Sequence, residues 1–278
     1  MEMLLVHIAL LLYTFGVAAW LAWLVRATPA RVRAARWSMI AGAILHAGAL
    51  VEGATLVSQT GAWRAGYVLS LLAFLTVLGY LLFDRRGSSP VVGAFVAPVA
   101  LSLLLPGHLV ASSARVVPPR IAQSIALFVH VAASALGTAA LALGLGLAVL
   151  YLAGEKQAKS RRPGRLFSRL TSLHAIDRGG YHCAVWGFIF LSLANVTGAV
   201  VSSEATGSVL PLGAKQIFAV LAWALLAVTL QARLVSGWRG RRSAVLVLVG
   251  SALVAAVYVA LLSGPAANTL AAAMGVSP

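Results

Sequence analysis

Acidic residues are scarce in this chain, and charge of either sign is rare. Only 6 of the 278 residues are Asp or Glu, and 10% are charged, against 61% that are hydrophobic. The mean hydropathy is +0.95. A water-soluble domain carries about 25% charged residues to cover its surface. The composition therefore excludes a water-soluble fold, and we expect lipid to surround most of the chain.

Cysteine is almost absent as well. The single cysteine, Cys183, excludes an intrachain disulfide, a thiolate metal cluster and a C-x-x-C redox pair. We interpret Cys183 as a small apolar residue. The first 25 residues lack the basic stretch that opens a signal peptide, and their apolar run is too long for one. We expect this run to be the first membrane span, kept in the mature protein.

Basic residues supply most of the charge, with 21 Lys and Arg and a formal net charge of +15. A nucleic-acid-binding domain gathers its cations on one face of a folded surface. Here the cations fall between apolar blocks, which is typical of the loops of a membrane protein. We therefore expect the lipid bilayer, and no nucleic acid, as the partner of these charges.

The apolar blocks predict an all-α integral membrane protein, a bundle of about eight transmembrane helices. A helix needs about 20 apolar residues to cross the hydrocarbon core of a bilayer. The fifth block is longer than that, so we expect it to be tilted or to extend past the lipid. The blocks form one polytopic domain over residues 1–278, with spans at about 3–25, 38–57, 67–83, 91–110, 122–152, 181–201, 214–235 and 244–262.

The loops between the spans predict the orientation. Cytoplasmic loops carry an excess of Lys and Arg, so we expect the basic loops in the cytoplasm and both termini outside. The longest loop, 153–180, is expected on the inner surface, as an amphipathic helix or as a lipid-attracted charge run. One side holds only Arg64, Arg115, Arg120 and Lys215, and the other holds Arg26, Arg31, Arg33, Arg36, Arg85, Arg86, Lys156, Lys159, Arg161, Arg162, Arg165, Arg169, Arg178, Arg239, Arg241 and Arg242.

Polar residues inside the spans are few, and each is a candidate for function because such residues are costly in lipid. They include neither a series of Asp and Glu residues, as a proton relay would need, nor the regularly spaced arginines of a voltage sensor. A transporter is therefore a less favoured interpretation. The histidines form an outer set (7, 108, 130) and an inner set (46, 174, 182). The intramembrane polar residues are His7, His46, Glu52, His108, His130, His182, Asn195, Gln231 and Arg233.

Imidazole in a helix bundle has one use that needs neither carboxylates nor thiols, the axial ligation of haem iron. Zinc would need three or four close ligands, and no H-x-x-x-H spacing occurs. The alternative for each histidine is a single interhelical hydrogen bond, which is also the simplest interpretation of Asn195 and Gln231.

Two sequence patterns next to the histidines are also compatible with either haem binding or helix packing. Small residues follow His130 along one face, which would allow close helix packing or the approach of a flat macrocycle. Trp186 and Phe190 follow His182 at spacings of four and eight, which suits a porphyrin face or ordinary core packing. The small residues are Ala133, Ser134, Gly137, Thr138, Ala140 and Gly144.

The second half of the chain resembles the cytochrome c assembly protein family, which includes the CcsA/ResC, CcmC and HemX groups. The resemblance covers about residues 120–262 and is strongest for members similar to HemX and YpjD that lack the tryptophan-rich motif. Its most specific parts are FVHV (128–131), Trp223 and GWRGRR (237–242). The similar segments are FVHVAASALGTAALALGLGLAVLYL (128–152), LHAIDRGGYHCAVWGFIFLSLANVTGAVVSS (173–203) and AKQIFAVLAWALLAVTLQARLVSGWRGRRSA (214–244).

The resemblance implies a haem-handling protein of the bacterial inner membrane. It assigns His130 to the outward-facing haem ligand and His46 to the second-span histidine, which makes both of them candidate axial ligands of the iron. His182 matches a histidine of the YpjD-like members. The implied cofactor is non-covalent haem b, and the implied partners are haem and another membrane subunit of cytochrome c assembly.

The chain also departs from the family pattern. Leu210, Leu212 and Gly213 stand where the outer tryptophan-rich motif would have two tryptophans and an aspartate. Gln231 replaces an expected histidine, and no histidine follows the last span. His108, at the outer end of span four, is a candidate replacement ligand. We therefore expect no covalent attachment activity from this chain alone, and no enzyme activity.

Three functions follow from these observations. The leading hypothesis is a haem-binding membrane protein that relays, stores or senses haem during cytochrome c assembly. The alternative is a HemX-like regulator that contacts a haem-biosynthesis enzyme through the loop 153–180 and binds no cofactor. A small-molecule transporter is the third, although the intramembrane polar groups are few for a polar path.

Overall fold

A computed structural model of the protein confirms the all-α membrane bundle. It describes residues 2–60, 62–85, 90–109, 114–116, 121, 124–160, 172–209 and 214–262. Seven helices are long and apolar enough to cross a membrane, and the apolar part of α4 is shorter, at Pro90–Leu105. With α4 included, the described residues hold eight helices of 20 residues or more: α1 (Glu2–Val25), α2 (Pro29–Thr60), α3 (Ala65–Asp84), α4 (Pro90–Leu109), α6 (Ile125–Lys159), α7 (Leu173–Thr206), α8 (Ala214–Val235) and α9 (Arg241–Leu262).

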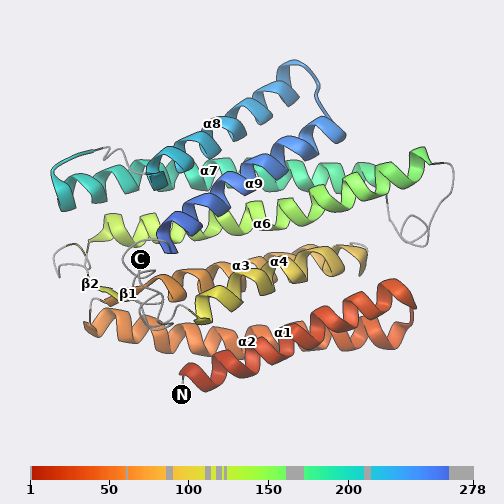
Figure 1. Cartoon of the computed structure of the whole chain (residues 1–278), viewed down its shortest axis with the longest axis horizontal. Coiled ribbons are helices and arrows are strands. Elements are labelled where there is room, and N and C mark those ends of the chain that lie inside the picture. The colour runs from red at the N-terminus through yellow and green to blue at the C-terminus, as the bar shows by residue number, and fades with distance from the viewer. Residues whose placement is uncertain are drawn as a thin grey trace, which may run out of the picture.

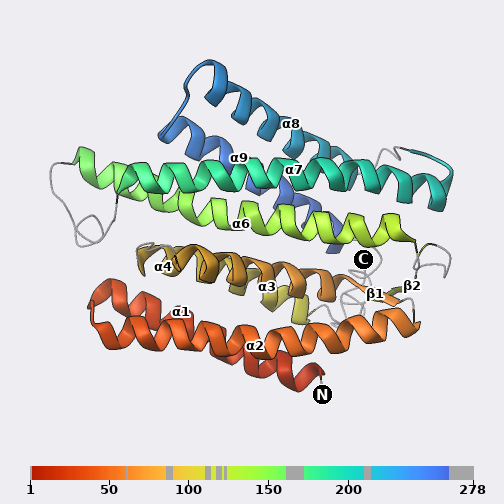
Figure 2. The ribbon, with the colours of Figure 1, turned by 180° about the vertical axis from the view of Figure 1, so that it is seen from behind.

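The helices stack in four pairs, as Figure 1 shows. The pairs are α1 with α2, α3 with α4, α6 with α7, and α8 with α9, and the members of each pair contact each other along their length. Helix α6 also contacts α3, α4 and α9. Seen from behind, α1 and α2 lie on one side of the stack, and α8 and α9 lie on the other (Figure 2). Helix α6 therefore joins the two halves of the bundle.

Capping residues explain where the two longest helices, α6 and α7, begin and where α7 ends. Ser124 caps α6, because its hydroxyl accepts a hydrogen bond from the Leu127 amide at 3.1 Å. Ser172 caps α7 in the same way, at 3.3 Å from the Ala175 amide. Helix α7 ends at Gly207, whose φ of +72° is a conformation that glycine adopts without strain.

The predicted spans agree with the observed helices except at some ends. Helix α2 begins at Pro29 instead of 38, and α7 begins at Leu173 instead of 181. The expected loop 153–180 is therefore corrected at both ends, because residues 153–159 belong to α6 and residues 173–180 form the first turns of α7. The rest of the expected surface helix, at residues 161–171, lies outside the described residues. At 35 and 34 residues, α6 and α7 are each about 50 Å long, which exceeds a hydrocarbon core of about 30 Å.

Most of the basic residues that the structure describes lie at one end of the bundle, the end at the right in Figure 1. This basic end is formed by the ends of the helices at the α1–α2, α3–α4, α6–α7 and α8–α9 connections. At the opposite end, the α2–α3 and α4–α6 connections pair as two short antiparallel strands, β1 (Ala62–Arg64) and β2 (Ala114–Val116), which were not expected. The side of the membrane that each end faces stays a prediction.

The small residues of α6 serve helix packing. A Cβ atom on Gly137 would lie 3.0 Å from Leu191 of α7, and one on Gly146 would lie 2.8 Å from Val96 of α4. Cys183 is buried, and a Cβ atom on Gly144 would lie 3.2 Å from its Cβ. The packing interpretation of this face is thus confirmed, as is the interpretation of Cys183 as a small apolar residue.

Candidate functional site

His130 lies on α6 five residues after the helix begins, near the opposite end of the bundle. The Ser124 cap fixes the first turn of α6 and therefore the direction in which His130 points. The imidazole is half-buried and faces α7, where its Nδ1 lies 2.8 Å from the carbonyl oxygen of Ala194. The contact between α6 and α7 thus positions this side chain.

The bond to Ala194 decides which nitrogen of His130 is available. A carbonyl oxygen can only accept a hydrogen bond, so Nδ1 carries a hydrogen, and in the neutral imidazole Nε2 then keeps its lone pair. Nε2 makes no hydrogen bond to any other residue that the structure describes. Histidines that bind metals use this arrangement, in which one nitrogen donates to a carbonyl and the other is the ligand. The side chain therefore fits an axial ligand of haem iron.

A glycine makes room for this imidazole. A Cβ atom on Gly198 of α7 would lie 2.8 Å from Cε1 and 2.9 Å from Nδ1 of His130. Carbon atoms without a bond between them do not approach so closely in proteins, so any larger residue at this position would displace the ring. Gly198 and the Ala194 carbonyl together hold the imidazole in one orientation.

His46 has a different environment. Its side chain is fully buried, and both of its nitrogens have partners: the Tyr13 hydroxyl lies 3.3 Å from Nδ1, and the Ser70 hydroxyl lies 2.7 Å from Nε2. The rings of Tyr13 and Phe74 pack edge-on against the imidazole at 5.7 Å. His46 and His130 share none of these neighbours. As an iron ligand, His46 would first have to give up one of the two hydrogen bonds.

His182 makes no contact with His46 or His130 among the described residues. His182 is exposed on α7 and packs beside Tyr181, with 5.9 Å between the ring centres. His108 lies in the last turn of α4, and its side chain is outside the part of the chain that the structure describes. Within the described residues, no group of three or more His, Cys, Asp and Glu side chains could hold a metal ion.

Two polar residues do not behave as the sequence suggested. Asn195 and Gln231 were expected to make interhelical hydrogen bonds, but neither side chain makes a hydrogen bond to another residue that the structure describes. Gln231 is exposed on α8, at the position where a histidine would stand in the family pattern. Its side chain faces away from the bundle, so no neighbouring helix is in reach to supply a partner.

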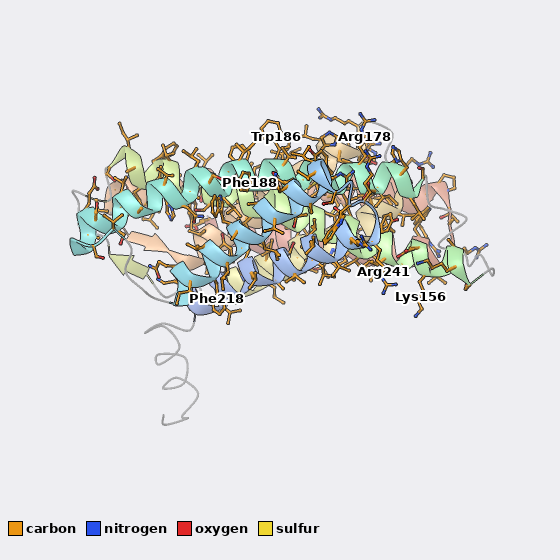
Figure 3. The ribbon with its side chains drawn as sticks, turned by 90° about the horizontal axis from the view of Figure 1, so that it is seen from above. Lys156, Arg178, Trp186, Phe188, Phe218 and Arg241 are labelled. Atoms are coloured by element: carbon orange, nitrogen blue, oxygen red, sulfur yellow. The ribbon has the colours of Figure 1, made fainter. Side chains whose placement is uncertain are left out.

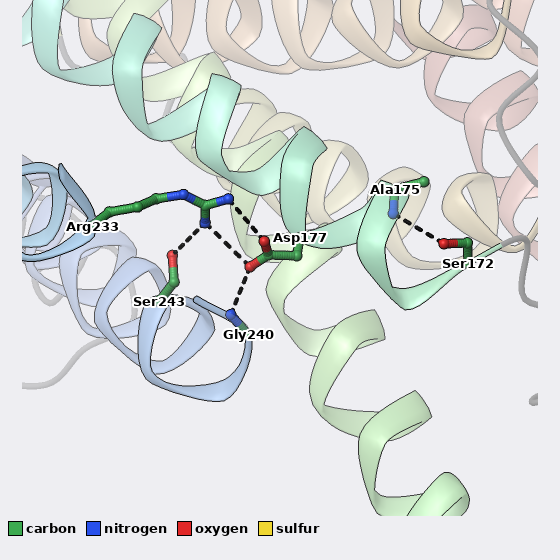
Figure 4. Close-up of polar contacts among 6 residues, drawn as sticks. All are labelled: Ser172, Ala175, Asp177, Arg233, Gly240 and Ser243. Carbon is green, nitrogen blue, oxygen red and sulfur yellow. Dashed lines mark hydrogen bonds and ion pairs between the residues drawn. The ribbon is translucent and has the colours of Figure 1, made fainter. Parts of the chain in front are cut away.

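An ion pair at the basic end was missed by the sequence analysis. Arg233 of α8 donates from Nη2 to Oδ2 of Asp177 at 2.8 Å and from Nη1 to Oδ1 at 3.2 Å (Figure 4). Oδ1 also accepts from the amide of Gly240, at 2.8 Å. The guanidinium lies 4.4 Å from the centre of the Tyr181 ring. The sequence signal was Arg233 itself, since an arginine inside an apolar block requires a partner.

This ion pair links α7, α8 and the turn before α9. Gly240 has a φ of +65°, which its position in the turn requires, and a Cβ atom there would lie 2.6 Å from the Tyr151 hydroxyl. The carboxylate of Asp177 and the guanidinium of Arg233 are mostly buried, with exposed fractions of 9% and 12%. The GWRGRR stretch therefore has a structural role at Gly240, because its turn closes over Asp177.

Trp223 also has a structural role. Its indole nitrogen donates to the Ser192 hydroxyl of α7 at 2.7 Å, and its ring stacks on Phe188 at 5.7 Å between centres. These contacts fix α8 against α7. Of the two further aromatic residues of α7, Trp186 is 54% exposed and does not belong to the core, and Phe190 is half-buried.

Comparison with known proteins gives a consistent result. The sequence model of a family described as Cytochrome C assembly protein matches residues 9–264. The chain is similar to proteins called cytochrome c biogenesis protein CcsA. It is 31% identical to the one from Synechococcus sp. (strain CC9902) over 71% of this chain and 75% of the relative. For Parasynechococcus marenigrum (strain WH8102) the identity is 32%, with the same coverage of both chains.

Proposed function

Because the chain belongs to the cytochrome c assembly protein family, we propose that it handles haem in the membrane during cytochrome c biogenesis. Haem is the cargo in this proposal: it is bound without a covalent bond, as haem b, and is relayed, stored or sensed. The observation that carries the proposal is His130, whose Nδ1 is bound by the Ala194 carbonyl and whose Nε2 has no partner among the described residues. Covalent attachment of haem to an apocytochrome is assigned to a partner subunit.

The roles of the chain's own residues follow from this geometry. Nε2 of His130 binds the iron of the cargo, while Gly198 and the Ala194 carbonyl orient the imidazole for that bond. His46 is proposed as a second ligand, from which Ser70 or Tyr13 would have to be released. His182 and His108 are proposed as further contacts with haem.

The proposal includes a location. We place the protein in the bacterial inner membrane, with the basic end in the cytoplasm, because Lys and Arg are retained on that side. His130 then lies toward the outer face, where cytochromes c are assembled in the family that this chain resembles.

Visible spectroscopy on the full chain tests the proposed function. The protein is purified in mild detergent from haem-replete cells, and its spectrum is recorded before and after reduction with dithionite. We expect a Soret band with sharp reduced α and β bands in the wild type and a shift or loss of that band in His130→Ala. His174→Ala is the control, because His174 is exposed at the other end of the bundle. A colourless wild type that also fails to take up hemin would contradict the proposal.

A further inference from the structure

The turn between α8 and α9, residues 236–240, carries a cluster of arginines together with the start of α9. Arg239 lies in the turn, and Arg241 and Arg242 are the first two residues of α9. All three residues are exposed. Three positive charges therefore lie within four residues of the chain, at the basic end of the bundle.

These three arginines make no ion pair with a carboxylate that the structure describes. Other cations of the basic end do. The ion pairs described there are Arg36 with Asp84, Lys159 with Glu155 and Arg233 with Asp177. Because Asp177 already neutralises Arg233, the neighbouring arginines of the turn keep their full charge. Guanidinium groups form strong, charge-assisted hydrogen bonds with phosphate. The turn can therefore bind an anion from outside the chain.

The backbone of the turn is held at two points. The Gly240 amide donates to Oδ1 of Asp177 at 2.8 Å, and the Trp238 amide donates to the carbonyl oxygen of Ala232 at 3.2 Å. The guanidinium of Arg242 lies over the ring of Trp238, 5.2 Å from its centre. A turn that is fixed in this way holds its cations together before a ligand arrives, so less conformational entropy is lost on binding.

Apolar side chains border the arginines on both helices. Leu234 and Val235, at the end of α8, are 71% and 73% exposed, and Val245, near the start of α9, is 41% exposed. Trp238 is 37% exposed, and tryptophan is common at the level of the lipid headgroups. The surface thus joins positive charge to an apolar border at the end of two membrane spans, which suits a ligand with an anionic head and an apolar tail.

We propose that this surface binds the phosphate of an anionic phospholipid, in the leaflet at the basic end. Arg239, Arg241 and Arg242 pair with the headgroup, and the acyl chains lie along Leu234 and Val235. A zwitterionic lipid fits less well, because the arginines repel the ammonium group that it carries beside its phosphate. Bound lipid stabilises the α8–α9 turn, because a ligand of the folded state shifts the folding equilibrium.

Lys156 of α6 adds a positive charge near the turn. Gly240 lies against α6, since a Cβ atom on it would lie 2.6 Å from the Tyr151 hydroxyl. Lys156 follows Tyr151 by five residues and is exposed. Figure 3 shows Lys156 and Arg241 on the same side of the bundle, opposite Arg178. The positive surface of the turn therefore extends onto α6.

Native mass spectrometry of the full chain in detergent tests the lipid site. Phosphatidylglycerol and phosphatidylcholine are titrated separately, and the lipid adducts are counted. We expect a tighter first adduct with phosphatidylglycerol. A variant with Arg239→Gln, Arg241→Gln and Arg242→Gln should weaken that adduct by about fivefold for each arginine removed. Inorganic phosphate should not displace the lipid, because it cannot use the apolar border.

A matched control removes the same charge elsewhere at the basic end. It combines Arg26→Gln, Arg33→Gln and Arg85→Gln, which change three exposed arginines that have no ion pair with a carboxylate among the described residues. Salt screens the effect of distant charges, so this variant should keep the affinity for phosphatidylglycerol within about twofold. Gel filtration without added lipid checks that both triple variants are folded.

The outcomes separate a lipid site from a general effect of charge. The proposal is overturned if phosphatidylcholine binds as tightly as phosphatidylglycerol, if the control variant loses as much affinity as the variant of the turn, or if inorganic phosphate displaces the lipid. The lipid site does not depend on haem. A colourless wild type would contradict the proposed function and leave a selective phosphatidylglycerol adduct as evidence for this site.

Discussion

At the scale of the residue, two histidines that look equivalent in the sequence have different hydrogen-bond partners in the structure. His46 and His130 are both intramembrane histidines of the resemblance, but both nitrogens of His46 are bound and only Nδ1 of His130 is. The sequence located both positions and could not show this difference. The partners of His46 lie 33 and 24 residues away, and the partner of His130 lies 64 residues away, so no local pattern records them.

The space beside His130 gives a prediction at this scale. In Gly198→Ala, the new methyl group would displace the imidazole, so we expect weaker hemin binding, by about tenfold, and an altered Soret band. The control is Gly180→Ala on the same helix, where a Cβ atom would meet nothing within 4 Å. That change should leave the spectrum unchanged and stabilise α7 by about 0.5–1 kcal/mol. Identical spectra for Gly198→Ala and the wild type would show that the orientation of His130 is unimportant.

At the scale of the element, hydropathy locates the part of a helix that lies in lipid, and capping determines where the helix ends. The predicted span at 214–235 coincides with α8. The first turns of α2 carry Arg31, Arg33 and Arg36, which are compatible with a helix but not with hydrocarbon, so hydropathy alone could not include them. The same reason explains the early start of α7.

The Asp177–Arg233 pair gives a prediction at the scale of the element. Asp177→Asn would leave a guanidinium in a mostly buried position without its counter-charge, so we expect a loss of about 3–5 kcal/mol in the free energy of unfolding. Glu155→Gln is the control, because its partner Lys159 is 66% exposed and such pairs contribute only about 0.5 kcal/mol. Thermal unfolding in detergent measures both. Equal shifts of Tm in the two variants would contradict a structural role for the buried pair.

At the scale of the whole molecule, the order of the layers could not be predicted from the sequence. Every span is apolar around most of its circumference, so periodicity does not show which face meets which neighbour. In the structure, polar contacts between residues that are distant in the sequence show which faces meet. One example is the hydrogen bond between the hydroxyls of Thr138 of α6 and Tyr258 of α9, at 3.1 Å. The fold class follows from the composition, and the packing of the helix pairs does not.

The orientation in the membrane gives a prediction at this scale. The only cysteine, Cys183, is buried, so a Cys183→Ala chain can carry single reporter cysteines. We expect a membrane-impermeant maleimide to label Ser208→Cys, at the opposite end, in intact cells. Ser236→Cys, in the turn at the basic end, should be labelled only after the cells are broken. The reverse pattern would place the basic end outside and would contradict the proposed location.

The layered arrangement has a consequence for biosynthesis. Helices α1 to α4 contact one another, α6 packs on α3 and α4, and α7 and α9 pack on α6. The spatial order of the stack is therefore the order in which the ribosome delivers the helices. Each pair of helices that enters the membrane after the first therefore meets a partner surface that is already there.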